Sequence, residues 1–552
     1  MKSDYELAQE APLRRIPAVA AEMGLPEDRL IPYGHYKAKI ALHPPDAAKE
    51  AAARLILVTA ITPNKAGIGK TTTSIGLADG LRRLGRRAVL ALREPSLGPC
   101  FGMKGGAAGG GYSQVLPMDD INLHFTGDFH AITSANNTLA ALLDNYRYFN
   151  PGKPEGVKQV LFQRCLDVND RALRQVLTGL GGHGVPAESG FVITPASELM
   201  AVLCLASGPD DLRARIGRIL LGFTYGGEPL SPDSLGVTGA IAALLKDALL
   251  PNLVQTMEGT PALIHGGPFA NIAHGCNSVI ATRTALQYGE YVVTEAGFAA
   301  DLGAEKFFHI KCRAAGLQPA LSVLTATLQA LRLHGGSSEA RMKQPDAQAL
   351  RQGLRNLARH IRILQGFGQP VLVALNRFAG DPPEEIALLR AWCAEQGVAF
   401  AVNDAFAQGG AGAMELAQAV ADACEAPAPP LQYAYELAEP VEDKISQIVR
   451  KVYGGEGAVL SKAAREALAA IRRLGLEHLP VCMAKTQYAF TDDPAVSGLD
   501  GGFTIRVDDL AVSRGAGFIV AICGEMMRMP GLPRRPQALS IDVSNGRITG
   551  LS

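Results

Sequence analysis

The stretch that decides the fold runs from Arg54 to Tyr112 and reads RLILVTAITPNKAGIGKTTTSIGLADGLRRLGRRAVLALREPSLGPCFGMKGGAAGGGY. Its apolar run over residues 55–61 predicts a buried parallel strand. Apolar residues then recur at helical spacing over residues 74–84, and the run Ala88–Leu92 predicts a second strand. This order of strand, glycine-containing loop, helix and strand predicts an α/β fold with a P-loop-type parallel sheet.

The loop TPNKAGIGKTTT over residues 62–73 is suited to hold a phosphate. Its glycines let backbone N–H groups turn toward the phosphate, and the following helix adds its N-terminal dipole. Lys70 is placed to neutralise phosphate oxygens, and the hydroxyl of Thr71 to hold Mg²⁺. Because Asn64 stands where the full pattern has glycine, a plain strand-to-helix turn is the alternative, but the intact GKTTT favours phosphate binding. The predicted nucleotide contacts are Lys65, Gly67, Gly69, Lys70, Thr71 and Thr72, with Thr71 as the metal ligand.

Composition is typical of a soluble globular protein, with 47% apolar and 19% charged residues. Lys+Arg and Asp+Glu number 53 each, so no net charge favours nucleic acid or an anionic membrane as a partner. The nine cysteines form no CxxC pair, which indicates reduced thiols. The start of the sequence lacks the apolar core of a signal peptide, and no segment is long enough to span a bilayer. We therefore expect a cytoplasmic protein.

The chain is long enough for about two to four domains. Strand, helix and strand patterns over residues 370–402 predict a second, smaller α/β unit, which ends at the run Ala426–Pro430. A mixed C-terminal region follows. The predicted domains are 1–360, 361–455 and 456–552.

Two further stretches carry unusual residues. Residues 102–111 contain six glycines, which excludes a stable helix or strand interior and favours a pocket built from backbone over a flexible linker. In Asn122–His130, two histidines and Asp128 lie close together, but their spacing matches no zinc motif. We expect a structural or substrate-facing polar loop there.

Several motifs together resemble bacterial formate–tetrahydrofolate ligase. They span nearly the whole chain and are Leu92–Pro99, Gly102–Tyr112, Pro117–His124, Ala135–Asn137, His265–Asn277, Glu295–Phe298, Asp301–Lys306, Pro480–Tyr488 and Met529–Pro533. The resemblance implies two steps, in which ATP phosphorylates formate to formyl phosphate and the 10-nitrogen of tetrahydrofolate then attacks the formyl carbon. It also implies ATP and Mg²⁺, tetrahydrofolate as a substrate, a role for a monovalent cation, and a homo-oligomer, a tetramer in the family.

The resemblance assigns roles to individual residues. Lys70 and Arg93 match positions that hold the transferring phosphoryl group and the acyl phosphate, and Asp128 matches a residue that assists at the folate nitrogen. A salt bridge at a strand end is the alternative for Arg93, but its place directly after the second strand favours a ligand site. The folate-lining positions match Phe298, Phe378 and Phe406, whose flat rings suit a pterin and a benzoyl group. Phe406 stands where the family usually has tryptophan.

Other positions depart from the family pattern, so the chain is expected to be a divergent member. Lys65 stands in place of proline, and charged residues of the family are replaced at Ile68, Val192, Ala320, Gln329, Gln408 and Ala411. One alternative function is therefore a paralogue of the same fold that acts on another small acid or is inactive as a ligase.

A second alternative is a nucleotide switch. Lys65–Thr73 also resembles the signature-lysine loop of partition-type and iron-protein ATPases, which drive partner binding. Those proteins are much shorter and lack the Gly102–Tyr112 run. The alternatives differ in whether ATP turnover needs formate and tetrahydrofolate together.

Overall fold

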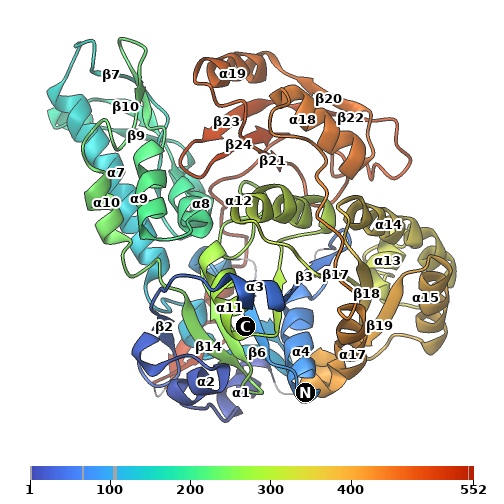
Figure 1. Cartoon of the computed structure of the whole chain (residues 1–552). Helices are drawn as coiled ribbons and strands as arrows, with labels where there is room; N and C mark the ends of the chain where they lie inside the picture. Colours follow the sequence, from blue (N-terminus) through green and yellow to red (C-terminus); the bar gives the residue numbers. More distant parts are fainter. Residues whose placement is uncertain (1–2, 65–66, 103–107, 545, 552) are drawn as a thin grey trace.

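The computed structural model describes residues 3–64, 67–102, 108–544 and 546–551 (Figure 1). Among these residues, 12 strands form one large sheet. Its main path runs β1 (Leu30–Pro32), β2 (Ala38–Ile40), β14 (Asn252–Thr256), β15 (Pro261–Ile264), β4 (Ala88–Leu92), β16 (Tyr291–Glu295), β3 (Arg54–Ala60), β17 (Leu321–Ala326), β18 (Val371–Asn376) and β19 (Ala399–Asn403). Off this path, β5 (Gly109–Gly110) pairs with β6 (Ser113–Leu116), which pairs with β14.

All neighbouring strands from β15 to β19 are parallel. Their carboxyl ends therefore meet at one edge of the sheet, where α/β proteins bind ligands. The phosphate loop follows β3 at this edge, Arg93 follows β4, and Glu295 ends β16.

Helices cover both faces of the sheet. They include α4 (Lys70–Arg83) and α17 (Met414–Ala423) on one face, and α11 (Val279–Tyr288) and α14 (Ala347–Gly366) on the other. Successive residues of β3 alternate between these layers because strand side chains point to opposite faces. Ile56 and Val58 pack in the core with α4, whereas Leu55 and Leu57 pack in the core with α11 and α14. This double burial explains the unbroken apolar run in the sequence.

The predicted strand, loop, helix and strand are confirmed as β3, α4 and β4 with the loop between β3 and α4. The strands predicted in the second α/β unit are present as β18 and β19, with α15 (Pro383–Glu395) between them. They extend the large sheet beside β17 rather than forming a sheet of their own. The boundary predicted at residue 360 thus falls between strands of one continuous sheet.

Two further units flank the sheet (Figure 1). The C-terminal unit, orange to red, contains α18 (Val441–Ile448), β20 (Gly457–Leu460), α19 (Lys462–Arg473), β21 (Val481–Ala484), β22 (Thr504–Val507), β23 (Asp509–Ser513) and β24 (Phe518–Ile522). The projecting unit, at the upper left, contains α7 (Asp128–Phe149), β7 (Val157–Val160), β9 (Val176–Thr178), β10 (Ala187–Ser189), α8 (Glu198–Leu205), α9 (Pro209–Arg218), β12 (Gly222–Thr224), β13 (Pro229–Leu230) and α10 (Thr238–Leu244).

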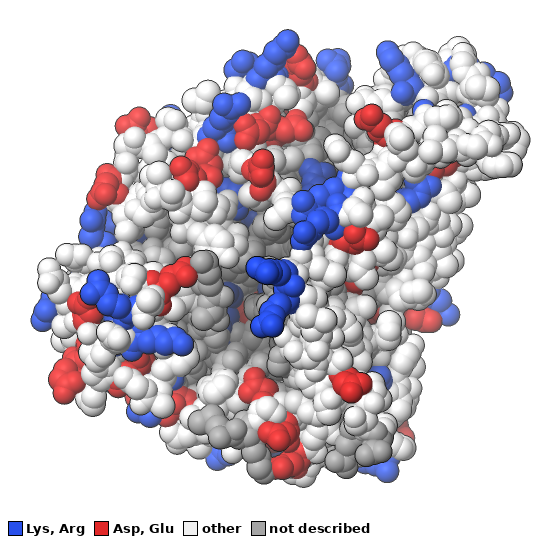
Figure 2. All heavy atoms as spheres, turned by 180° about the vertical axis from the view of Figure 1, so that it is seen from behind, with Lys and Arg blue, Asp and Glu red and all other residues white. Residues whose placement is uncertain are grey.

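Shorter elements complete the chain. They include α1 (Asp4–Glu10), α2 (Ile16–Met23), α3 (Ala47–Ala52), α5 (Leu97–Phe101), α6 (Met118–Asn122), β8 (Arg164–Cys165), β11 (Phe191–Val192), α12 (Arg313–Ala315), α13 (Leu328–His334), α16 (Ala405–Gln408), β25 (Asp542–Ser544) and β26 (Arg547–Thr549). Within the described ranges, no helix combines the length and the apolar character needed to cross a membrane. Figure 2 shows both signs of charge interspersed over the rear face, with several Lys and Arg beside a central hollow.

Candidate active site

The phosphate loop is held in shape by its neighbours at the sheet edge. Gly69 precedes α4 in the left-handed conformation, with φ of 79°. A Cβ on Gly69 would lie 2.1 Å from Nδ2 of Asn376. That amide instead donates a 3.1 Å hydrogen bond to the carbonyl of Ile68. Glycine is therefore required here both by backbone conformation and by space, and Lys70 follows as the first residue of α4. Lys65, predicted to contact nucleotide, lies outside the described residues.

Two asparagines at strand ends support the loop and were not predicted as site residues. Asn376 ends β18 and Asn403 ends β19, the neighbouring strand. Nδ2 of Asn403 lies 3.2 Å from Oγ1 of Thr73 in α4 and 3.4 Å from Oδ1 of Asn376. Their signal in the sequence is a polar residue at the end of each predicted strand.

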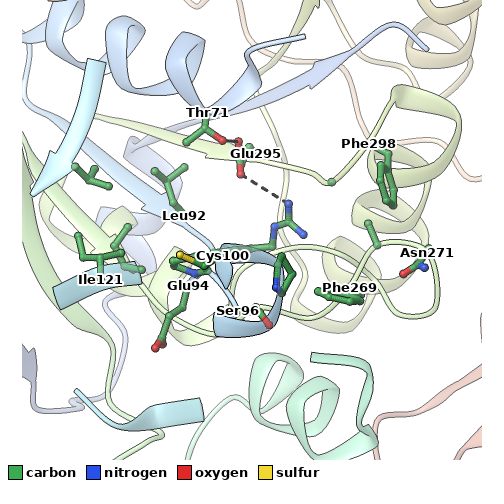
Figure 3. Close-up of a pocket in the computed structure, with 18 residues that line it drawn as sticks. Thr71, Leu92, Glu94, Ser96, Cys100, Ile121, Phe269, Asn271, Glu295 and Phe298 are labelled. Carbon is green, nitrogen blue, oxygen red and sulfur yellow. Dashed lines mark hydrogen bonds and ion pairs between the residues drawn. The ribbon is translucent and has the colours of Figure 1, made fainter. Parts of the chain in front are cut away.

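A cavity of about 300 Å³ opens between the loop and the strand ends (Figure 3). Thr71 and Glu295 lie on one side of it, and Phe298 and Phe269 form another wall. Leu92 lies opposite the phenylalanines. The remaining lining residues are Arg93, Glu94, Pro95, Ser96, Pro99, Cys100, Val115, Ile121, Ile264, Gly267, Ala270, Asn271 and Gly297. The structure thus brings the predicted residues Thr71, Arg93 and Phe298 to one cavity.

Glu295 connects the phosphate loop with Arg93. Its Oε2 accepts a 2.9 Å hydrogen bond from the hydroxyl of Thr71, and its Oε1 lies 3.9 Å from the Arg93 guanidinium. Arg93 also donates to the carbonyl of Pro268 at 3.4 Å. Its Nε has no hydrogen-bond partner among the described residues. The long ion pair leaves donor capacity of Arg93 for an anion in the cavity, which supports the ligand-site interpretation over a structural salt bridge.

Glu94 is one of the residues that line the cavity, and its carboxyl points downward in Figure 3, away from Thr71 and Glu295. Burial and the nearby Asp128 carboxylate raise the pKa of Glu94 well above its usual range, and Lys39 acts in the opposite direction. Oε2 of Glu94 has no hydrogen-bond partner among the described residues. Sequence reasoning assigned no role to this residue, although it directly follows Arg93.

Asp128 does not line the cavity. It is the first residue of α7 and is 2% exposed. One carboxylate oxygen accepts from Nζ of Lys39 and the other from Nδ2 of Asn252, each at 2.7 Å. The residue predicted to assist at the folate nitrogen therefore lies in a buried ion pair behind Glu94, and it acts on that carboxyl through charge.

The three predicted folate residues lie in two places. Phe298 lines the cavity and has φ of 58°, a conformation that is strained for a bulky side chain and is often found at functional sites. Phe378 and Phe406 follow β18 and β19 at the same sheet edge, and each is 41% exposed. They do not line the 300 Å³ cavity. Exposed rings beside a ligand edge remain available for stacking.

A cluster of polar side chains fixes the start of the loop at Thr62. His360 Nε2 accepts a 2.9 Å hydrogen bond from the Thr62 N–H, and His334 Nε2 donates to its carbonyl at 2.8 Å. Nδ2 of Asn356 donates to its hydroxyl at 3.0 Å. Burial lowers the pKa of His360 to about 4, which keeps the ring neutral and able to accept. Thr62 and Tyr488 both line a second cavity of about 390 Å³.

Two of the residues that depart from the family pattern, Ile68 and Val192, are buried. Ile68 is 3% exposed and belongs to the hydrophobic core, and Val192 is also buried. The Ile68 side chain is therefore compatible with its apolar surroundings. Nothing in the structure explains the departures at Ala320, Gln329 and Ala411, whereas Gln408 donates to Asp404 at 2.6 Å.

The described residues contain no group of three His, Cys, Asp or Glu side chains able to hold a metal ion. The oxygens of Thr71 and Glu295 do fit Mg²⁺, which prefers oxygen ligands and is usually bound by one or two protein groups together with substrate phosphates. A Mg²⁺ ion that binds together with a nucleotide does not need three protein ligands, because the phosphates supply the others.

Comparison with known proteins identifies the family of the chain. Residues 2–552 match the family described as formate–tetrahydrofolate ligase. Relatives named formate–tetrahydrofolate ligase include proteins of Parabacteroides distasonis (57% identical) and Porphyromonas gingivalis (58% identical), each aligned over the full length of both chains. A third, from Bacteroides fragilis, is 56% identical over the same extent. The chain therefore belongs to the formate–tetrahydrofolate ligase family.

Proposed function

We propose that the protein ligates formate to tetrahydrofolate with ATP, through formyl phosphate, giving 10-formyltetrahydrofolate, ADP and phosphate. The observation that carries this proposal is the shared cavity of Thr71, Arg93 and Phe298. It joins a phosphate-loop hydroxyl, a cation suited to an acyl phosphate and an aromatic wall in a space of about 300 Å³.

In the first step, a formate oxygen attacks the γ-phosphorus of ATP, and the bond to the bridging oxygen breaks to release ADP. Lys70 and the loop backbone hold the phosphates, and Arg93 neutralises the charge that develops on the transferred group. Mg²⁺, when bound, adds further neutralisation, and Thr71 with Glu295 would hold it. The protein thus contributes mainly positioning and charge.

The nucleoside of ATP extends from the loop into the second cavity. Thr62, Pro63 and Asn64 line that cavity at the start of the phosphate loop. Tyr488 supplies an aromatic ring there, and Asn356 supplies an amide. Both groups suit a purine and a ribose.

In the second step, the 10-nitrogen attacks the formyl carbon, phosphate leaves, and the nitrogen gives up a proton. Phe298, Phe378 and Phe406 hold the flat rings of tetrahydrofolate. Asp128 assists through Glu94, a residue that lines the cavity, because the charge of Asp128 raises the proton affinity of the Glu94 carboxyl. A carboxylate with a raised pKa is a stronger base for the departing proton.

The proposal includes properties of the whole enzyme. We propose a cytoplasmic homo-oligomer, a tetramer as in the family, which light scattering on the purified protein tests. We also propose a requirement for a monovalent cation, tested by turnover in potassium against tetramethylammonium salts.

The test of the function is production of 10-formyltetrahydrofolate, followed by mass spectrometry, with each substrate omitted in turn. Sustained ATP turnover is expected only when formate and tetrahydrofolate are both present, because formate alone supports only the first step. Assays with other small carboxylic acids in place of formate test the alternative that the protein is a paralogue acting on another acid. ATP hydrolysis that continues without either substrate would favour the nucleotide switch.

A further inference from the structure

The ring of Phe406 rests on a backbone surface made by two glycines. A Cβ on Gly111 would lie 2.9 Å from Cγ of Phe406, and a Cβ on Gly110 would lie 3.1 Å from its Cε2. Side chains at these positions would therefore push the ring away. Because Phe406 is still 41% exposed, its ring has a free surface for a flat ligand.

The chain that carries Phe406 is held from both sides. On the N-terminal side, the hydroxyl of Ser113 donates to the Ala405 carbonyl at 3.0 Å, and the Tyr112 N–H donates to the Phe406 carbonyl at 2.9 Å. On the C-terminal side, the Gly410 N–H donates to Oε1 of Glu258 at 2.8 Å. The last contact is made by a charged side chain from a distant part of the sequence.

Glu258 lies in the short turn between β14 and β15, which is tied to the phosphate helix α4. The hydroxyls of Thr256 and Thr260 donate to Oδ1 of Asp79 in α4, at 2.6 and 2.5 Å. Oε2 of Glu258 pairs with Nε of Arg83, also in α4, at 2.7 Å. The turn therefore transmits the position of α4 to the segment after Phe406.

The glycines after Phe406 are shaped to receive this carboxylate. A Cβ on Gly409 would lie 2.6 Å from Oε1 of Glu258, and one on Gly410 would lie 2.9 Å from Oε2. Gly409 also has φ of 59°, which disfavours any larger residue. The Glu258 carboxylate can therefore come this close to the backbone only because residues 409 and 410 are both glycine.

We propose that Glu258 is a positioning residue for the folate step: it holds the Gly409–Ala413 segment so that the Phe406 ring presents its free face to the rings of tetrahydrofolate. This inference rests on the proposed function. It concerns folate binding alone, since Glu258 does not line either cavity at the phosphate loop.

Kinetics of Glu258→Ala provide the first test. The Michaelis constant for tetrahydrofolate is expected to rise about threefold to tenfold, the range for loss of one aromatic contact, with that for ATP unchanged. Glu258→Gln is expected to restore folate affinity, because its amide oxygen still accepts from Gly410. Arg83→Ala is the matched control: it removes the other partner of the Glu258 carboxylate but leaves the Gly410 contact and the ties of Thr256 and Thr260 to Asp79 in place, so a smaller effect is expected.

Fluorescence separates positioning from general damage. The chain has one tryptophan, Trp392. The double variant Trp392→Phe with Phe406→Trp therefore has a single tryptophan as its fluorescent reporter, at position 406. Tetrahydrofolate alone should quench this reporter, and adding Glu258→Ala should shift the titration to higher concentration by the same factor as the kinetic change. Thermal melts of each variant confirm that it is folded at the assay temperature.

Three outcomes would overturn the inference. The first is that Glu258→Ala raises the Michaelis constants for ATP and for tetrahydrofolate by the same factor. The second is an equal folate effect of Arg83→Ala. The third is unchanged folate affinity in Glu258→Ala while Phe406→Ala weakens it, which leaves the proposed function intact. If Phe406→Ala itself leaves folate affinity unchanged, the assignment of the folate site fails together with the inference.

Discussion

The hydroxyl of Thr71 donates a 2.9 Å hydrogen bond to the carboxylate of Glu295, and this contact joins the phosphate loop to the end of β16. The second oxygen of Glu295 faces Arg93 at 3.9 Å. One carboxylate therefore sets the distance between the group that would hold a metal and the cation that would hold the transferred phosphoryl group.

Lys70→Ala should lower turnover by about a thousandfold or more, because a phosphate clamp stabilises the transition state by several kcal/mol. The protein should remain folded, as judged by its thermal melt. Lys462→Ala is the control, since that side chain is 88% exposed on the C-terminal unit. Near-normal turnover of folded Lys70→Ala would exclude the phosphate-loop assignment.

Arg93→Ala and Asp128→Asn should separate the two steps. Arg93→Ala is expected to lose both the forward reaction and ATP formation from ADP and formyl phosphate. Asp128→Asn should keep much of the ATP formation and lose the folate step. Equal loss of acyl-phosphate chemistry in both variants would contradict this division.

Asp128→Asn should also reduce stability, because Lys39 would lose its buried carboxylate partner. Breaking a buried ion pair by removing one partner costs about 3–5 kcal/mol. Assays therefore need a temperature at which the denaturation curve shows the variant folded. An unchanged denaturation midpoint would mean that the pair with Lys39 contributes little.

Thr71→Ala should raise the Mg²⁺ concentration needed for half-maximal turnover, by about tenfold if one oxygen ligand is lost. Thr71→Ser keeps the hydroxyl and should behave like the unaltered protein. Turnover at fixed ATP over a Mg²⁺ series measures the effect. Identical Mg²⁺ curves for Thr71→Ala and Thr71→Ser would remove Thr71 from the metal site.

Asp79→Asn should change how stability depends on pH. Burial raises the pKa of Asp79 to about 7 from an ordinary value of 3.8. The native state then binds the Asp79 proton more tightly than the unfolded state does, so this contribution is complete below pH 3.8 and is lost as pH rises through 7. The upper bound is about 4 kcal/mol.

The amide of Asp79→Asn can still accept from Thr256 and Thr260 but does not titrate. The variant should therefore be as stable as the unaltered protein near pH 4 and more stable near pH 8, as measured by urea denaturation. A stability difference that does not vary over this pH range would show that Asp79 titrates normally.

Local features could be predicted from the sequence, because neighbouring residues determine them. The strand β3, the loop glycines and α4 follow from apolar spacing and from one contiguous motif. Arg93 could also be placed, since a residue that directly follows a parallel strand must lie at the ligand edge.

Features that depend on distant residues could not be predicted in this way. That β18 and β19 extend the large sheet depends on strand order, which local patterns do not encode. The partner of Asp128 is Lys39, which lies 89 residues away in the sequence. Asn376 and Glu295 are ordinary polar residues until the fold brings them to Ile68 and Thr71.

The most direct test of the central claim is the fate of the formate oxygens in a single turnover. Formate labelled with oxygen-18 on both oxygens is incubated with enzyme, ATP and tetrahydrofolate, and the phosphate is analysed by mass spectrometry. If formyl phosphate is the intermediate, one labelled oxygen per product is transferred to inorganic phosphate and the other stays on the formyl group. Phosphate that carries no label, while labelled 10-formyltetrahydrofolate forms, would contradict the account.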